Sequence, residues 1–518
     1  MDKRKSNKFG TMKGIAWLTL STVILKIIGV IYKVPISHIL GDEGMGYFNS
    51  AYTVYTLFYI LCTSGIPKGI SIIISKYEAE HHSSSDSFYK ATMLILGAIG
   101  IFLTFLFILF APLFTKIISS NNSLIPMYAV APSVLFVCMN GVARGYLTGK
   151  MKFSHIAISE VIIGALKLVV GLLLAIIGMK LLLPTPIICA LAILGITVGT
   201  LVSTVYLASV CGINTSGTPI KISRNEIVNL IKISFPITFA SVGTGLIAVF
   251  DLFLIMRGLA ENGYSEGVAN ALYGNYSTLT LPMISLVSTL ISPIVTAYAP
   301  TLARKYAKGE YKEYLEYINE SLSLVSFITI PCFCVFLIYP DKLLGIIFEN
   351  GSVILGFTML SVIAPGVLLL GATTVINNAI EVTGRVKIPV ISISVGAFVK
   401  MIITIILMKH TDLGILSAPL GTLISYTVSL IISYLGFKMM FKYNLGIYKS
   451  ATLPLFSSAT ALLFSMLFSE LLAKLGESII QSIIILSIFA FTYLANMLIL
   501  SKKSRKLFAK IRKINKIV

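Results

Sequence analysis

Long apolar stretches follow one another along almost the whole chain, and short polar segments separate them. A helix that crosses the hydrocarbon core of a bilayer needs roughly 20 apolar residues. Lipid offers no partner to an open backbone, and the stretches lack the two-residue alternation of a membrane barrel, so each is expected to be a helix. We predict about fourteen spans, at residues 14–40, 47–75, 89–118, 124–147, 154–178, 185–210, 227–256, 268–299, 316–339, 353–383, 388–408, 413–437, 450–473 and 478–500.

Composition agrees with this pattern. The chain has 518 residues, of which 56% are hydrophobic and 12% are charged, and its mean hydropathy is +0.92. A soluble domain of this size needs far more charge to cover its surface. The first stretch has no small-residue cleavage site and reads as a span, not as a removable signal. The predicted fold class is an all-α polytopic membrane protein.

The net charge of +20 follows the topology of the predicted helices. Lys and Arg cluster in alternate connections, as expected for loops on the cytoplasmic side. This distribution predicts that both termini are cytoplasmic, and it explains the charge without nucleic-acid binding. The basic segments are residues 3–13, 150–152, 221–224, 304–312, 385–387, 438–449 and 502–516.

An internal repeat organises the chain. The segment Thr148-Gly-Lys-Met-Lys152 reappears as Thr383-Gly-Arg-Val-Lys387, and each copy leads into an apolar helix with a lone lysine, Lys167 or Lys400. Chance similarity among apolar helices is the alternative, but several features keep the same order in both copies. An even number of spans separates the copies, so they enter the membrane in the same direction.

A parallel repeat predicts two six-helix bundles with a central cleft, in which one site can face each side of the membrane in turn. The predicted segments are an N-terminal bundle at 1–210, a linker at 211–226, a C-terminal bundle at 227–437, two added helices at 450–500 and a basic tail at 501–518.

Apart from those at helix ends, five lysines lie inside the predicted spans, where a charge costs about 2.5–3.5 kcal/mol on insertion scales. Fewer acids accompany them, so an anionic guest such as a phosphate would explain the surplus of cations. Pairing with acids between helices and snorkelling toward an interface are the alternatives. The candidate cavity cations are Lys26, Lys33, Lys68, Lys167 and Lys400.

Carboxylate and amide groups in the spans could hold Na⁺ or relay a proton; an ordinary hydrogen-bond cluster between helices is the alternative. The candidates are Asp251, Asn377, Glu381 and Glu160. The cysteines and histidines show no metal-binding or redox spacing. Enzyme motifs are not found, and the connections are too short to build a catalytic pocket, so we predict a protein that is not an enzyme and has no cofactor apart from possible Na⁺ or H⁺ coupling.

The chain resembles the multidrug/oligosaccharidyl-lipid/polysaccharide flippase superfamily, in the branch of stage V sporulation protein B and the MurJ-like lipid II flippases. The residues that carry the resemblance are Lys26-Ile-Ile-Gly29, Gly41, Gly44, Ser64-Gly-Ile-Pro67, Ser75-Lys-Tyr77, Arg144-Gly-Tyr-Leu-Thr-Gly149, Lys167, Leu281-Pro282, the segment 303–311 and Lys400. The chain departs from Gram-negative relatives, which carry an arginine pair where Tyr59-Ile60 stands, and it has no cation ahead of Pro282.

The resemblance implies a monomeric fourteen-helix flippase in a bacterial plasma membrane, in contact with membrane lipids. Its cationic cleft would receive the pyrophosphate of an undecaprenyl-linked sugar, such as a peptidoglycan precursor or a polysaccharide repeat unit, and membrane potential or an ion gradient would drive transport. The alternatives are export of cationic drugs, a membrane glycosyltransferase or ligase, and a scaffold for wall or spore assembly that transports nothing.

Overall fold

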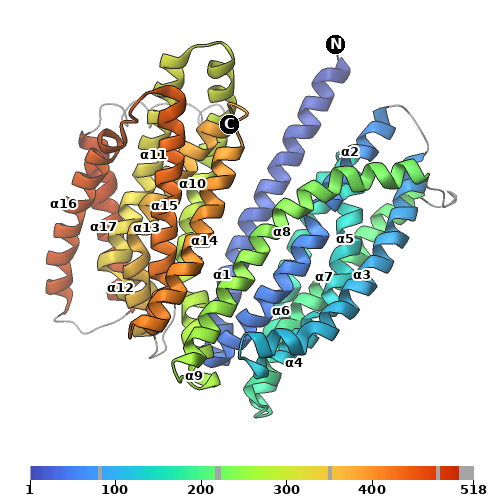
Figure 1. Ribbon diagram of the computed structural model, residues 1–518, viewed down its shortest axis with the longest axis horizontal. Helices are drawn as coiled ribbons and strands as arrows, with labels where there is room; N and C mark the ends of the chain where they lie inside the picture. Colours follow the sequence, from blue (N-terminus) through green and yellow to red (C-terminus); the bar gives the residue numbers. More distant parts are fainter. Residues whose placement is uncertain (1, 80–83, 216–222, 348–352, 474–478, 501–518) are drawn as a thin grey trace. The chain divides into compact units, whose positions relative to one another are not determined.

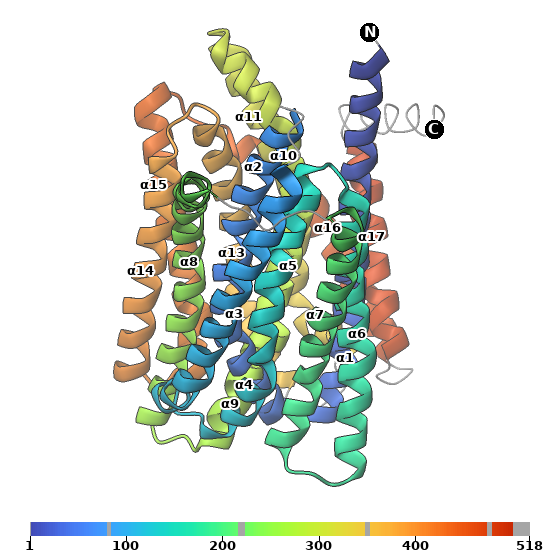
Figure 2. The same cartoon turned by 90° about the vertical axis from the view of Figure 1, so that its right-hand side faces the viewer.

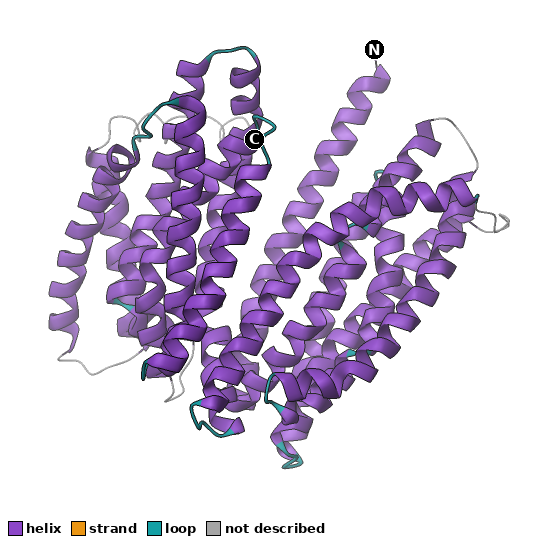
Figure 3. Ribbon diagram, viewed as in Figure 1, coloured by secondary structure: helices purple, strands orange, loops and turns teal. Residues whose placement is uncertain are grey.

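The computed structural model describes residues 2–79, 84–215, 223–347, 353–473 and 479–500. Most side chains before residue 21, and that of Lys26, lie outside the described part. The described residues are almost entirely helical and contain no strand (Figure 3). The chain forms two compact units, Met1–Gly274 (unit 1) and Asn275–Val518 (unit 2), which are described separately.

The elements follow the predicted spans closely (Figure 1). Unit 1 contains α1 (Asp2–Thr63), α2 (Ile66–Ala79), α3 (Ser84–Ile117), η1 (Asn121–Ser123), α4 (Leu124–Val130), α5 (Pro132–Gly149), α6 (Phe153–Lys180), α7 (Thr185–Thr215), α8 (Arg224–Glu261) and most of α9 (Glu266–Asn275). Unit 2 contains η2 (Tyr276–Thr280), α10 (Leu281–Ala307), α11 (Tyr311–Ile338), α12 (Pro340–Ile347), α13 (Val353–Glu381), α14 (Lys387–His410), η3 (Gly414–Leu416), α15 (Ser417–Phe441), α16 (Ile447–Ala473) and α17 (Ile479–Leu500).

The described helices include 13 candidate membrane spans, the first of which covers residues 27–78. That span joins two helices, because α1 breaks at Gly41, whose φ of 62° and ψ of −175° are not helical. Glycine adopts a positive φ without the steric cost that other residues pay. Counting the two parts separately gives 14 helices, which confirms the predicted fold class of an all-α polytopic membrane protein.

Unit 1 is held together by helices that approach closely through small residues. α6 and α7 run side by side (Figure 2). A Cβ atom on Gly195 of α7 would lie 2.6 Å from Cα of Gly171 on α6, so the two backbones touch. Such contact suits lipid, where helices associate by van der Waals packing and not by expelling water. A second core joins α2, α3 and α5 around Ile70, Ile74 and Tyr146.

Unit 2 has a larger apolar core, which α10, α11, α13 and α15 share and which includes Ile291, Ile318 and Ile363. α17 packs on α16, and its Phe489 and Tyr493 join a smaller cluster with Cys334 of α11. The two added helices predicted at 450–500 are therefore part of this unit.

The boundary between the two units, at Gly274 and Asn275, falls inside the predicted eighth span. α9 lies on α1, and a Cβ atom on Gly46 would overlap the backbone of Asn270. The chain then continues through η2, a five-residue π-helical segment, into α10. α8 also packs on α1 and α2. The division into bundles at residues 1–210 and 227–437 stays a prediction.

The described residues correct one expectation from the cysteine spacing. The cysteines show no redox spacing in the sequence, whereas Cys62 of α1 and Cys138 of α5 form a disulfide in unit 1. Sequence spacing cannot reveal this pairing, because packing of two helices creates it.

Candidate functional site

Aromatic rings line both arms of the α1 hairpin. Tyr32 lies before the break at Gly41, and its ring centroid is 6.3 Å from that of Phe48, which lies after the break. The rings continue along the second arm at helical spacing, with centroids 6.3 Å apart between Phe48 and Tyr52 and 6.0 Å apart between Tyr52 and Tyr55. The reversal at Gly41 therefore places rings from both arms on one side of the hairpin.

Lys167 of α6 reaches these rings. Its Nζ atom lies 4.8 Å from the ring centroid of Tyr32 and 5.3 Å from that of Tyr52. An ammonium group over an aromatic face is attracted by the quadrupole of the ring. Among the described residues, no carboxylate forms an ion pair with Lys167. The rings hold the cation in place, and within the described part of the chain its charge has no carboxylate as a counter-ion.

Lys33 belongs to the same group. It follows Tyr32 in α1, and its ammonium group is close enough to Lys167 for the two charges to interact. Lys26 lies seven residues before Lys33 on the same helix face, but its side chain is outside the described residues. The structure thus brings together two of the five predicted cations.

Lys68 and Lys400 have other surroundings. Lys68 is exposed on α2, on the side that also carries Ser71, while Ile70 and Ile74 of the same helix are buried. Lys400 belongs to unit 2, where it lies beside Gly421.

Glu160 has a cation of its own. Arg144 Nη1 lies 3.2 Å from Glu160 Oε1, and Ser21 donates a hydrogen bond of 3.2 Å to Oε2. Both charged side chains are mostly buried, at 18% and 25% exposure. Glu160 therefore pairs with Arg144 across α5 and α6, and not with Lys167 on its own helix.

The remaining coupling candidates are spread over two units. Asp251 is half-buried on α8 in unit 1. In unit 2, Asn377 Oδ1 accepts a 2.7 Å hydrogen bond from Ser433, as expected for a hydrogen-bond cluster between helices. Glu381 is exposed at the end of α13.

Two parts of this site were missed in the sequence. Arg144 entered only as part of a motif, although a lone arginine near the end of an apolar run was a usable signal. The tyrosines gave no comparable signal, because aromatic residues occur throughout membrane helices.

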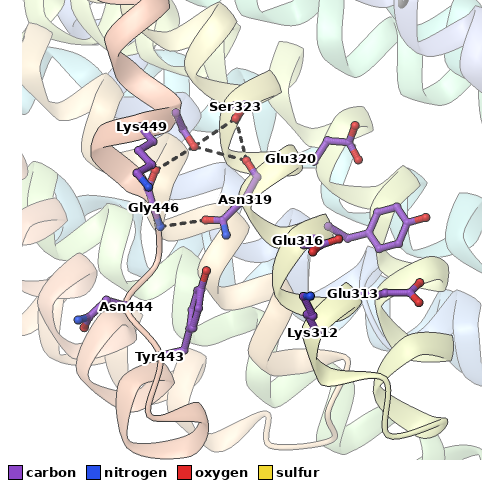
Figure 4. Close-up of a pocket in the computed structure, with 12 residues that line it drawn as sticks. Lys312, Glu313, Glu316, Asn319, Glu320, Ser323, Tyr443, Asn444, Gly446 and Lys449 are labelled. Atoms are coloured by element: carbon purple, nitrogen blue, oxygen red, sulfur yellow. Dashed lines mark hydrogen bonds between the residues drawn. The ribbon is translucent and has the colours of Figure 1, made fainter. Parts of the chain in front are cut away.

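A large cavity lies elsewhere, in unit 2. It measures about 1030 Å³ and opens between α11 and the segment that leads into α16 (Figure 4). Asn319 closes one wall by accepting a 2.9 Å hydrogen bond from the backbone of Gly446. None of the predicted site residues lines it. Its wall carries charges of both signs, from Glu313, Glu316, Glu320, Lys312 and Lys449.

A cluster of ionic contacts lies beside this cavity. Lys305 Nζ lies 2.6 Å from Glu310 Oε2 and 2.5 Å from Glu313 Oε2. Glu310 lies between two spans, and the hydrogen bond from Lys305 holds the pKa of its carboxyl below the ordinary value. This contact fixes the turn between α10 and α11.

The helices and the lysine–tyrosine group define a multi-pass membrane protein with a cationic site in its first unit. The chain belongs to the family described as polysaccharide biosynthesis protein, whose model matches residues 11–305, more than half of its length. The MatE family model matches residues 277–406. The predicted membership of the multidrug/oligosaccharidyl-lipid/polysaccharide superfamily, in the MurJ and stage V sporulation protein B branch, is confirmed.

Curated relatives and a solved structure match most of the chain. It is 24% identical to lipid II flippase MurJ of Bacillus subtilis (strain 168) over 456 residues, 82% of each chain. It is 23% identical to stage V sporulation protein B of the same organism, over 79% of this chain and 80% of the relative. A structure of lipid II flippase MurJ in an inward closed conformation superposes with a TM-score of 0.68 at 16% identity, covering 95% of this chain and 99% of that one. This last similarity concerns the fold.

Proposed function

We propose that this protein moves an undecaprenyl-pyrophosphate-linked sugar across a bacterial plasma membrane by alternating access. The observation that carries the proposal is the pair Lys33 and Lys167, of which Lys167 is held by tyrosine rings and has no ion-paired carboxylate among the described residues. A pyrophosphate supplies the missing negative charge, and charge-assisted hydrogen bonds to phosphate oxygens are strong.

The comparisons support this class of cargo. The relatives named above include a lipid II flippase, and the matching family model is that of polysaccharide biosynthesis proteins. A peptidoglycan precursor and a polysaccharide repeat unit both present a pyrophosphate to the same cations. The internal repeat supports alternating access, because parallel repeats are common in transporters that work this way. The orientation with both termini in the cytoplasm is part of the proposal.

Membrane potential or an ion gradient is the proposed energy source. Glu381 is a better candidate for a Na⁺ or proton step than Glu160 or Asn377, and Asp251 stays a candidate. Glu160 already pairs with Arg144, and Asn377 already accepts a hydrogen bond from Ser433. No catalytic step is part of the proposal.

Export of a cationic drug is the second candidate, and the match of the MatE model to residues 277–406 favours it. A binding site for a cation would place acids or open aromatic faces toward the substrate. The faces of Tyr32 and Tyr52 are instead turned to Lys167. Because Lys167 already occupies these ring faces, an anionic substrate matches unit 1 better than a cationic drug does.

Transport by purified protein in liposomes tests the proposal. A fluorescent polyprenyl-pyrophosphoryl disaccharide is placed in the membrane, and a quencher added outside reports the fraction in the outer leaflet. We expect wild-type protein to move the lipid and Lys167→Gln to slow movement at least tenfold. Lys180→Gln, at the exposed end of the same helix, is the matched control and should transport normally.

Two results would overturn the proposal. In one, wild-type vesicles move the lipid no faster than protein-free vesicles. In the other, Lys167→Gln transports as fast as Lys180→Gln at equal protein content. A scaffold that transports nothing predicts the first result, together with unchanged wall or spore assembly in cells that carry Lys167→Gln.

A further inference from the structure

A second basic pocket lies in unit 1, between α2 and α8. The two helices touch where Gly65 and Gly69 face Ser234, and a Cβ atom on either glycine would overlap that serine. They run in opposite directions, so residues after Gly69 on α2 lie opposite residues before Ser234 on α8. Beyond this contact the helices leave a cavity of about 280 Å³.

A hydrogen bond closes the far end of the cavity. The hydroxyl group of Tyr77 donates to Glu226 Oε1, and Glu226 Oε2 accepts a 2.5 Å hydrogen bond from the backbone of Ser223. Ser223 caps the start of α8 in the same arrangement. Both carboxylate oxygens of Glu226 therefore have protein donors, and the floor of the cavity is fixed to both helices.

The wall of the cavity joins donors of hydrogen bonds to apolar surface. Lys76 comes from α2, while Asn229 and Lys232 come from α8. Ile72, Ile73 and Ile233 complete the wall. Two ammonium groups and an amide suit a phosphate, which accepts several hydrogen bonds at once.

The surface beside the cavity is apolar and open. Ile72 is 54% exposed, and on α8 the exposure is 57% for Ile231 and 65% for Phe235. Side chains of this kind, next to lysines near the end of a span, match the boundary between acyl chains and headgroups. A soluble anion would need only the donors, whereas a lipid uses the donors and the apolar surface together.

We propose that the pocket between α2 and α8 binds the phosphate headgroup of an anionic phospholipid, with the acyl chains along Ile72 and Ile231. Basic pockets between membrane helices on the cytoplasmic side are a general means of binding anionic lipids. The cavity is smaller than a typical drug-sized site, which starts near 300 Å³, and a glycerophosphate headgroup fits it. The bound lipid bridges Lys76 and Lys232 and so ties α2 to α8. It is a structural lipid, separate from the transported cargo.

Native mass spectrometry of the delipidated full-length protein tests this site. Dioleoylphosphatidylglycerol, dioleoylphosphatidylcholine and soluble glycerol phosphate are titrated separately. We expect one phosphatidylglycerol to bind at least tenfold more tightly than phosphatidylcholine, with no binding of glycerol phosphate at equal concentration. Lys76→Gln/Lys232→Gln should lose this tight binding.

Lys308→Gln/Lys438→Gln is the matched control, because it removes two exposed lysines from other predicted cytoplasmic segments, in unit 2. It should bind phosphatidylglycerol as the wild type does. If the double variant does not fold, Lys232→Gln alone, at an exposed position, replaces it in the titration. Lys232→Arg keeps the positive charge and should bind phosphatidylglycerol as the wild type does. Equal phosphatidylglycerol affinity in the wild type and the Lys232 variants overturns the proposal. Tight binding of glycerol phosphate overturns the choice of a lipid. Neither readout depends on transport.

Discussion

Unit 1 and unit 2 carry the two copies of the predicted internal repeat, and the chemistry of their polar groups differs. In unit 1, Lys167 lies between the faces of Tyr32 and Tyr52, with Lys33 nearby. In unit 2, Lys400 packs beside Gly421, and the wall of the 1030 Å³ cavity carries three acids and two lysines. The lysine of the predicted repeat thus lies beside aromatic rings in unit 1 and beside a glycine in unit 2.

The difference shows that the two copies of a repeat can have different roles. Packing constrains the small residues of both copies, since helices in lipid associate through close contact. A charged side chain inside the membrane has a high free-energy cost, so such residues are rare and usually functional. We infer that unit 1 makes the main contacts with an anionic cargo and that unit 2 contributes less binding energy. The predictions below for Lys167, Lys400 and Tyr52 test this difference in binding energy, and the others compare the stability of the two units.

The largest effect is expected at the ion pair of Arg144 and Glu160, which only unit 1 contains. The repeat places Ala379 and Val395 at the corresponding positions of unit 2. Arg144→Gln leaves a mostly buried carboxylate without its cation and should lower the free energy of unfolding by about 3 kcal/mol. Chemical denaturation in detergent measures this change.

The double variant Arg144→Gln/Glu160→Gln supplies the control for the ion pair. Replacing both charges by neutral groups costs much less than removing one partner, so most of the stability should return. An Arg144→Gln protein as stable as the wild type would show that the pair is not structural, and Glu160 would again be a candidate for ion coupling.

The next effect compares the two repeat-related lysines. Lys167→Gln should weaken binding of a polyprenyl-pyrophosphate lipid by roughly 10–100-fold, because a hydrogen bond to a charged group contributes about 1.5–3 kcal/mol. Lys400→Gln should weaken it by about threefold or less. Equilibrium binding to both purified variants measures the ratio. Equal losses would remove the distinction between the units.

Tyr52 gives a smaller effect through the position of Lys167. Tyr52→Leu removes one aromatic face and should weaken cargo binding by roughly 2–10-fold, since a cation–π contact contributes about 0.5–1 kcal/mol or somewhat more when desolvated. Tyr52→Phe keeps the face and should bind nearly as the wild type does. If Tyr52→Phe is as weak as Tyr52→Leu, the hydroxyl group matters and the ring does not.

The smallest effect concerns the turn between α10 and α11 in unit 2. Lys305 holds the pKa of Glu310 below its ordinary value, so the ionised carboxylate stabilises the fold above about pH 4.3. That contribution is lost as the pH falls through the lower folded-state pKa. The melting temperature of the wild type should slightly exceed that of Glu310→Gln near neutral pH and equal it at low pH. Glu316→Gln, outside the contact with Lys305, is the control. A difference that persists in acid would contradict this cause.

Most of the fold was predictable from the sequence, because membrane spans depend on long apolar runs. The gap between the predicted spans 14–40 and 47–75 contains the break at Gly41. The separate start of α2 and the π-helical segment at Tyr276–Thr280 were not predicted. Both are local changes of backbone geometry inside apolar sequence, where hydropathy carries no signal.

The site was less predictable, because it depends on contacts between distant segments. Hydropathy identified Lys33 and Lys167 as costly charges, and the structure places them together. It could not identify Tyr32 and Tyr52, whose role arises from the reversal at Gly41 and the packing of α6 on α1. It could not identify the partner of Glu160 either, which is Arg144 of another helix.

Competition between two labelled ligands at the wild-type protein and at Lys167→Gln tests directly whether the site at Lys167 binds an anionic cargo. The ligands are a polyprenyl-pyrophosphoryl sugar and a lipophilic cation such as tetraphenylphosphonium. We expect the wild type to bind the pyrophosphate lipid and the Lys167→Gln variant to bind it at least tenfold more weakly. The lipophilic cation should not compete with it. Tight binding of the cation, made stronger by loss of the Lys167 charge, would contradict an anionic cargo at this site.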